Sequence, residues 1–155
     1  MLLNVLVIDD DRCVRAVIAS TLTRLGYEVR MAEDSGRGVR LLDEAPADLV
    51  IVDISTPQVV SIDLVAMLKA RHYPRKVVAV SGGGRFGGAE ALRRAMNCGA
   101  DAAFLKPLSM SAVAEIVGRL LEELDGELVR GRRTKPCRPP ATPLRNPAST
   151  STSRR

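Results

Sequence analysis

Side chains that can do chemistry follow four short apolar runs of this chain, each at the point where its run ends. They are Asp9-Asp10-Asp11 after residues 2–8, Asp53 after residues 48–52, Ser81 after residues 77–80, and Lys106, followed by Pro107, at the end of residues 102–106. If these runs are parallel strands of one sheet, their carboxyl ends meet along one edge. The sequence then predicts one cluster of carboxylates with a hydroxyl and an ammonium group.

The acidic part of this cluster points to a divalent cation. Carboxylates held close together repel one another, which raises their pKa values and costs stability unless a cation lies among them. Mg2+ commonly binds one or two carboxylates, several waters and phosphate oxygens. Asp10, Asp53 and a carbonyl of the loop after Asp53 are therefore candidate ligands of Mg2+. Lys106 adds a positive charge and Ser81 a hydroxyl, the two further groups that a phosphoryl group on Asp53 requires.

The elements that position these groups begin with five predicted strands. Residues 2–8, 48–52 and 77–80 are almost continuously apolar, which is typical of central parallel strands covered by helices on both faces. Residues 27–32 alternate in polarity, and residues 102–106 form a short and weak run. These last two segments are expected at the edges of the sheet.

Helices are predicted between the strands by apolar positions that recur every three or four residues. The pattern is clearest at Val14, Val17, Ile18, Thr21, Leu22 and Leu25, and again at Val113, Ile116, Val117, Leu120, Leu121 and Leu124. Asp11 and Ser35 are candidate N-caps, and Gly26 and Gly99 stand where a left-handed residue would end a helix. Five strands that alternate with five helices predict a doubly wound α/β fold, in which ligands bind beyond the carboxyl ends of the strands.

The length of the chain fits one domain, and the distribution of charge divides the chain after residue 125. The 155 residues include 23 Lys plus Arg, 18 Asp plus Glu and 46% hydrophobic residues, as expected for one ordinary globular domain. Residues 126–155 hold 8 basic and 1 acidic side chains, a net charge of +7, whereas residues 1–125 hold 15 and 17, a net charge of −2. The C-terminal segment carries five of the nine prolines and has no aromatic residue.

We therefore expect a folded domain over residues 1–125 and a disordered basic tail rich in Pro, Ser and Thr over residues 126–155. The tail is shorter than the roughly 40 residues that a free-standing domain usually requires, so no DNA-binding output domain is expected in it. Its arginines can attract an acidic partner through charge, without reading a sequence. The alternative is a tail that is simply solvated.

Membrane insertion, secretion and cysteine-based sites are not indicated. No window approaches the roughly 18 uncharged apolar residues of a membrane span, and the first residues lack the basic start and apolar stretch of a secretory signal. A cytoplasmic protein without a membrane contact is expected. Cys13, Cys98 and Cys137 are an odd number without CxxC spacing, which argues against a disulfide framework and a zinc site.

Four segments of the chain resemble the receiver domain of two-component response regulators. They are VIDDD at residues 7–11, DLVIVDISTP at 48–57, AVS at 79–81 and GADAAFLKP at 99–107. The resemblance covers about residues 3–124, the whole of the predicted folded domain. It implies a flavodoxin-like receiver fold, an α/β fold with a doubly wound five-stranded parallel sheet in the order 2-1-3-4-5, flanked by five helices.

The same resemblance implies a role for each residue of the predicted cluster. By this comparison Asp53 is the phosphoacceptor, Ser81 the switch hydroxyl, Lys106 the partner of the phosphoryl group, and Asp9, Asp10, Asp53 and the Ser55 backbone carbonyl hold Mg2+. The bond between Lys106 and Pro107 is expected to be cis, which proline permits at low cost.

The function implied is that of a single-domain response regulator in a two-component phosphorelay. Such a protein accepts a phosphoryl group, here on Asp53, from a sensor histidine kinase or a phosphotransfer protein. It then signals to a downstream protein through a conformational change. Because the attacking carboxylate is already ionised, the transfer needs positioning and charge neutralisation rather than a strong base. The chain is therefore expected to be a signalling module and not an enzyme.

Three features depart from the pattern of the family. After Pro57 the family often has Met-Asp-Gly, whereas Gln58-Val59-Val60-Ser61 stands here, so this loop lacks the usual glycine. Ala103 stands where the family usually has an aromatic residue three positions before the lysine, and Phe104 follows it on the opposite face by strand alternation. Residues 81–88, SGGGRFGG, make the loop after the fourth strand rich in glycine, which is similar to small stand-alone receivers. We therefore expect Ser81 to couple to this loop rather than to an aromatic side chain on the fifth strand.

Two other functions are compatible with some of these residues. Asp9 and Asp11 fit the DxD start of haloacid-dehalogenase-like phosphatases, as nucleophile and acid. Cys13 and the lack of a second acidic pair after Lys106 argue against that reading. The other alternative is a degenerate receiver that binds a partner without phosphorylation, and the intact acidic and basic positions argue against it.

Overall fold

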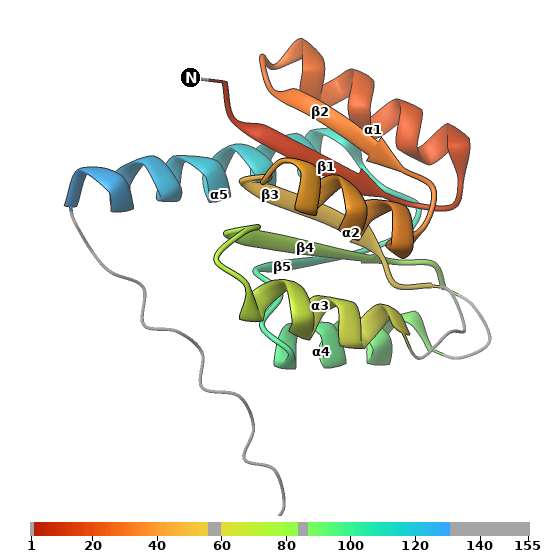
Figure 1. Cartoon of the computed structure of the whole chain (residues 1–155). Helices are drawn as coiled ribbons and strands as arrows, with labels where there is room; N and C mark the ends of the chain where they lie inside the picture. Colours follow the sequence, from red (N-terminus) through yellow and green to blue (C-terminus); the bar gives the residue numbers. More distant parts are fainter. Residues whose placement is uncertain (1, 56–59, 84–86, 131–155) are drawn as a thin grey trace, which may run out of the picture.

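The computed structural model describes residues 2–55, 60–83 and 87–130, which form a five-stranded parallel sheet with helices on both faces (Figure 1). The strands are β1 Asn4–Ile8, β2 Glu28–Ala32, β3 Leu49–Asp53, β4 Lys76–Ser81 and β5 Ala102–Leu105. They lie in the order β2-β1-β3-β4-β5, and every pair is parallel. The predicted fold class and strand order are confirmed, and the two weaker apolar segments form the edge strands.

Five helices connect the strands and cover the two faces of the sheet. They are α1 Arg12–Arg24, α2 Ser35–Glu44, α3 Val60–Ala70, α4 Gly88–Asn97 and α5 Met110–Arg130. Helices α1 and α5 pack on one face, and α2, α3 and α4 pack on the other (Figure 1). Within the residues that the structure describes, this division leaves the carboxyl ends of the strands without a covering helix.

The central strands place their side chains alternately in two hydrophobic clusters. Val5 and Val7 of β1 face α1 and α5, whereas Leu6 and Ile8 face the other three helices, and all four are buried. Full burial of one such side chain contributes about 1.5–3 kcal/mol. A shift of the strand by one residue would exchange the two faces, so this alternation determines the register and the place where the strand ends.

The predicted caps and turns are present with one exception. Asp11 caps α1, since its side chain accepts two amides of the first helical turn, at 2.8 and 3.2 Å. Gly26 and Gly99 have φ angles of 92° and 102°, in the left-handed region that favours glycine. The predicted cap Ser35 is wrong, because the preceding Asp34 has extended backbone and its carboxylate accepts an amide of α2 at 2.7 Å.

The last helix continues past the predicted domain boundary at residue 125. Two ion pairs, one on each side of this boundary, hold the end of α5 against the start of β4. Glu123 Oε2 lies 3.0 Å from Lys76 Nζ, and Glu127 Oε2 lies 3.6 Å from Arg75 Nη2. The two glutamates are four residues apart and therefore share one face of the helix. The predicted disorder of the tail stays a prediction, because residues 131–155 lie outside the described part of the chain.

The described thiols lie far apart in the fold. Cys13 is exposed at the start of α1, and Cys98 is half-buried after α4, on the other face of the sheet. They therefore cannot pair with each other. Cys137 lies outside the described residues. Within the described ranges, none of the helices is both long enough and apolar enough to cross a membrane.

Candidate functional site

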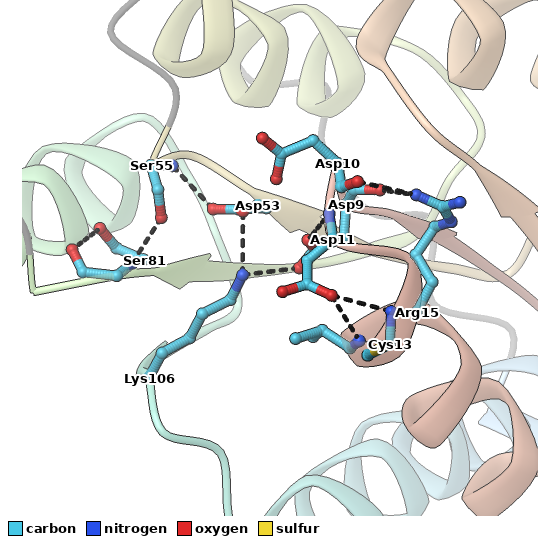
Figure 2. Close-up of polar contacts among 11 residues, drawn as sticks. Asp9, Asp10, Asp11, Cys13, Arg15, Asp53, Ser55, Ser81 and Lys106 are labelled. Atoms are coloured by element: carbon cyan, nitrogen blue, oxygen red, sulfur yellow. Dashed lines mark hydrogen bonds and ion pairs between the residues drawn. The ribbon is translucent and has the colours of Figure 1, made fainter.

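The predicted chemical groups meet at the carboxyl ends of β1, β3, β4 and β5 (Figure 2). Asp9 follows β1, Asp53 and Ser81 are the last residues of β3 and β4, and Lys106 follows β5. Asp9, Asp53 and Ser81 are only 3%, 8% and 2% exposed, and they are the buried polar residues of the described core. Polar groups buried in this way need partners, so their contacts determine what the site can do.

Lys106 links two of the acidic residues. Its Nζ atom lies 2.9 Å from Asp9 Oδ2 and 3.0 Å from Asp53 Oδ2. These distances are those of charge-assisted hydrogen bonds, which are roughly twice as strong as neutral ones. The bond between Lys106 and Pro107 is cis, as the resemblance implies.

Burial and ion pairing alter the proton affinity of Asp9 and Lys106. Burial raises the pKa of Asp9 above its usual value, and the hydrogen bond from Lys106 lowers it only in part. Burial also lowers the pKa of Lys106, but its hydrogen bonds to Asp9 and Asp53 and the attraction of both carboxylates outweigh burial and raise that pKa. Lys106 therefore stays protonated at neutral pH, and Asp9 occupies a site that favours its charge less than water does.

Asp9, Asp10 and Asp53 have carboxylate oxygens that all lie within 4.8 Å of one another. Asp10 is exposed, whereas Asp9 and Asp53 are buried. Three carboxylates and one ammonium, that of Lys106, leave this group of side chains with an excess of negative charge. Oxygen ligands, excess negative charge and a solvent-facing side fit a hard divalent cation such as Mg2+, which keeps several waters when it binds.

Ser55 contacts Asp53 through its backbone and the loop after β4 through its side chain (Figure 2). The Ser55 amide donates to Asp53 Oδ1 at 2.7 Å. The Ser55 hydroxyl accepts a hydrogen bond from the Gly82 amide. The first contact orients the carboxylate, and the second ties β3 to the residue that follows β4. The role of the Ser55 carbonyl as a metal ligand stays a prediction.

Ser81, the predicted switch hydroxyl, lies at the same edge of the sheet. Among the described contacts, its Oγ atom donates to the Gly82 carbonyl at 3.3 Å rather than to Asp53. Hydroxyl hydrogen bonds are most often 2.7–2.8 Å long, so this one is weak. The Ser81 hydroxyl can therefore exchange its present partner for a stronger acceptor at small cost.

Arg15 supports the loop that carries Asp9 and Asp10, and our sequence analysis did not find it. Its Nη1 atom donates to the backbone oxygen of Asp9 at 2.6 Å and to that of Asp10 at 3.2 Å. The Asp11 amide also donates to Asp9 Oδ1, at 2.8 Å. The signal available in the sequence is the spacing, since a basic residue four positions after the helix cap can reach back to the preceding loop.

Ala103 and Phe104 lie on opposite faces of β5, as strand alternation predicts. Phe104 packs on the side of α1 and α5, paired in register with Val80. Ala103 is paired with Ala79, whose side chain belongs to the cluster beneath α2, α3 and α4. Phe104 therefore lies on the face of β5 opposite to Ala103, the position at which the resemblance implies an aromatic residue. Residues 56–59 and 84–86, which the sequence places in the loops beside the site, lie outside the described residues.

A family comparison identifies this arrangement. The model of the response regulator receiver domain matches residues 5–118. The chain belongs to this family. The match covers β1 from Val5 onward, the other four strands and every residue of the site, and the resemblance seen in the sequence is confirmed. As a receiver domain, the chain is a module of two-component signalling.

Curated relatives of this receiver domain are longer proteins. The DNA-binding transcriptional regulator NtrC of Bradyrhizobium sp. (strain RP501 Parasponia) is 32% identical over 120 residues, which are 77% of this chain and 24% of NtrC. The response regulator protein PilR of Pseudomonas aeruginosa is 27% identical over 116 residues, which are 75% of this chain and 25% of PilR. This chain thus spans about a quarter of the length of these relatives.

Solved structures show the same receiver fold. NtrX from Brucella abortus, in complex with ADP, superposes with a TM-score of 0.72 at 27% identity, over 87% of this chain and 31% of that one. A CheY-like receiver domain protein from Methanospirillum hungatei superposes with a TM-score of 0.71 at 28% identity, over 82% of this chain and 99% of that one. The second match covers almost the whole of that receiver domain protein.

Membership in the receiver family bears on the other candidate functions. Receiver domains accept phosphoryl groups from histidine kinases and generally bind Mg2+ at an acidic pocket, and the acidic group of this chain is consistent with such a pocket. The phosphatase alternative has lost its support, because the chain is a receiver and Asp11, its required acid, is the exposed N-cap of α1. The degenerate receiver is the alternative that remains.

Proposed function

We propose that this receiver domain accepts a phosphoryl group on Asp53 and relays a signal in a two-component system. The observation that carries the proposal is the position of Asp53 Oδ2, which lies 3.0 Å from the Lys106 ammonium within the acidic group. The other oxygen, Oδ1, accepts the Ser55 amide at 2.7 Å. Both carboxylate oxygens are therefore held in place, which favours attack in one direction.

Phosphoryl transfer requires the protein to position the reactants and to neutralise charge. An oxygen of Asp53 forms a bond to phosphorus while the bond from phosphorus to the donor's imidazole nitrogen or acyl oxygen breaks, and the electron pair stays with the leaving group. Lys106 attracts the phosphoryl oxygens as a permanent cation. The Ser81 hydroxyl exchanges its weak bond to Gly82 for a bond to a phosphoryl oxygen.

We propose Mg2+ as the cofactor of this transfer. Asp9, Asp10, Asp53 and the backbone carbonyl of Ser55 would hold the ion. When bound, Mg2+ supplies positive charge that offsets the carboxylates and the incoming phosphoryl group. The excess of negative charge among these side chains supports this part of the proposal. Arg15 contributes by holding the backbone of the acidic loop.

The proposed phosphoryl donor is a sensor histidine kinase or a phosphotransfer protein. The phosphorylated domain then changes conformation and contacts a downstream protein. We propose that residues 1–125 act as the receiver domain of a response regulator and that the basic tail contacts acidic partners through charge. A cytoplasmic location without a membrane contact and a role as a signalling module rather than an enzyme belong to the same proposal.

Labelling with acetyl phosphate and Mg2+ tests the acceptor. Mass spectrometry of the wild-type chain should find one added phosphoryl group on Asp53. Asp53→Asn should remove the label while the circular dichroism spectrum stays unchanged. Asp43→Asn is the matched control, because Asp43 is an exposed carboxylate that pairs with Arg71 on the surface, at 2.9 Å. The control should be labelled as well as the wild type.

The same experiment separates the alternatives. Asp53→Asn labelled as strongly as the wild type would show that the acceptor is another residue. Transient phosphorylation of Asp9 would instead support the alternative function as a phosphatase. Unlabelled wild-type protein in the presence of Mg2+ would favour a degenerate receiver that acts as a binding module.

A further inference from the structure

The Gly82 amide has a partner that competes with the proposed phosphoryl group. It donates to the Ser55 hydroxyl, next to the Ser55 amide that holds Asp53 Oδ1 (Figure 2). Gly82 directly follows the last residue of β4, at the edge where a phosphoryl group on Asp53 would lie. An amide has one hydrogen to donate, so it serves one strong acceptor at a time. The Ser55 hydroxyl therefore occupies a donor that the phosphorylated site could use.

The two acceptors differ in strength. Hydrogen bonds to ionised acceptors are roughly twice as strong as those between neutral groups. A phosphoryl group brings three such oxygens to Asp53, whereas the Ser55 hydroxyl is neutral and lies on an exposed residue, where water can replace the amide as its partner. Transfer of the Gly82 amide from the hydroxyl to the phosphoryl group is thus favourable.

A displacement of Gly82 would change contacts at the surface of the domain. A Cβ atom added to Gly88, the first residue of α4, would lie 2.8 Å from the Gly82 carbonyl oxygen and 2.8 Å from Leu105 Cδ1. Gly88 therefore fits between the two groups only because it has no side chain. Leu105 is 49% exposed, precedes Lys106 and shares a face of β5 with Ala103. Displacement of the Gly82 carbonyl must change the packing at the start of α4 and at Leu105.

We propose that Ser55 is a positioning residue whose hydroxyl holds the Gly82 amide in the unphosphorylated protein. On phosphorylation the amide passes to the phosphoryl group, and the release moves Gly88 and the exposed Leu105 side chain. The inference rests on the proposed phosphorylation of Asp53. It assigns to Ser55, Gly82 and Leu105 the coupling that the small Ala103 side chain does not provide.

Two substitutions at Ser55 and one control test this coupling. Ser55→Ala removes the hydroxyl but keeps the backbone amide that bonds Asp53 and the backbone carbonyl proposed for Mg2+. Ser55→Thr keeps a hydroxyl and should rescue the behaviour of the wild type. Ser20→Ala, at an exposed serine of α1, is the control. Each full-length chain is studied by NMR with Mg2+, with and without beryllofluoride as a phosphoryl mimic.

Without beryllofluoride, the Gly82 amide of Ser55→Ala should exchange with solvent about fivefold faster than that of the wild type, as expected for one lost hydrogen bond. With beryllofluoride the two proteins should exchange at equal rates. The Leu105 methyl signals of free Ser55→Ala should lie part of the way toward their beryllofluoride positions. Labelling by acetyl phosphate should be about fivefold faster in this variant, because the amide is already released.

The outcomes separate this inference from the proposed function. An unchanged Gly82 exchange rate in free Ser55→Ala would overturn it, as would a Ser55-dependent difference that persists in beryllofluoride. If the Leu105 methyl signals shift neither on substitution of Ser55 nor on addition of beryllofluoride, the proposed path through Gly88 is wrong. If the wild type and Ser55→Ala both fail to bind beryllofluoride and to be labelled, the phosphorylation of Asp53 itself is wrong, and this inference fails with it.

Discussion

Lys106 forms a 3.0 Å ion pair with Asp53 although the two residues lie at the ends of strands that are not neighbours. Strand β4 separates β3 from β5, and it ends in the small side chain of Ser81, which permits the lysine to cross. The same ammonium lies 2.9 Å from Asp9, at the end of β1. The Lys106 ammonium therefore connects charged groups at the ends of β1, β3 and β5. A change of charge at one of these groups alters the electrostatic environment of the other two.

The first prediction concerns the charge of Lys106. Lys106→Gln should slow labelling of Asp53 by acetyl phosphate roughly 100-fold at saturating Mg2+, because a preorganised cation is lost at the oxygens where charge develops. Lys76→Gln is the control, since Lys76 begins β4 at the opposite end of the strand and pairs with Glu123. Initial rates from mass spectrometry give the comparison. Equal rates in Lys106→Gln and the wild type would limit this lysine to a structural role.

The second prediction concerns Asp9 and pH in the absence of metal. Burial raises the pKa of Asp9 in the folded state, so between its unfolded and folded pKa values the folded protein binds more protons. Stability must then fall as pH rises through that window. Asp9→Asn cannot ionise, so in EDTA it should unfold at a higher temperature than the wild type at pH 7.

The difference between Asp9→Asn and the wild type should shrink as the pH is lowered and wild-type Asp9 takes up its proton. Thermal midpoints in EDTA across the acidic range test this, with Asp43→Asn as the surface control. A variant less stable than the wild type at pH 7 would show that the ion pair with Lys106 outweighs the burial of Asp9.

The third prediction concerns Mg2+. A metal that binds only the folded state stabilises it by ~2.7 kcal/mol at 100 times its dissociation constant, so Mg2+ should raise the wild-type thermal midpoint. Asp10→Asn should hardly change the midpoint in EDTA, because Asp10 is exposed, but it should weaken the response to Mg2+ at least tenfold. Titrations at constant ionic strength test both statements. An unaltered Mg2+ response in Asp10→Asn would remove Asp10 from the ligand set.

The fourth prediction concerns the C-terminal boundary. Deletion of residues 131–155 should leave the thermal midpoint unchanged within about 1 °C, since the tail has little apolar surface to bury. Deletion of residues 126–155 also removes the end of α5 and the ion pair of Glu127 with Arg75, and should lower the midpoint by about 3–5 °C, on the order of 1 kcal/mol.

Glu127→Gln in the full chain separates the ion pair from the helix end. Both side chains are half-buried at the surface, and surface ion pairs contribute at most about 1 kcal/mol, so this substitution should have a smaller effect than the longer deletion. A large loss of stability on deletion of residues 131–155 would show that the tail docks on the domain.

The sequence by itself determined the fold class, the order of elements and the set of residues at the site. Apolar periodicity is a local property, and it identifies strands, helices and the places where strands end. Parallel strands share one carboxyl edge, so Asp9, Asp53, Ser81 and Lys106 had to converge once the strands were placed. The caps at Asp11 and Gly26 likewise depend on neighbours within a few residues.

Only the tertiary structure decided which of these groups touch and which are buried. Asp9 and Asp10 are adjacent and alike in the sequence, yet one is buried against Lys106 and the other is exposed. The bond of Ser55 to Gly82 joins two loops whose contact has no local signature. The reason is physical: each side chain's direction is set by the pleat of its own strand, whereas its partner lies on another strand whose distance and register depend on packing of the whole core.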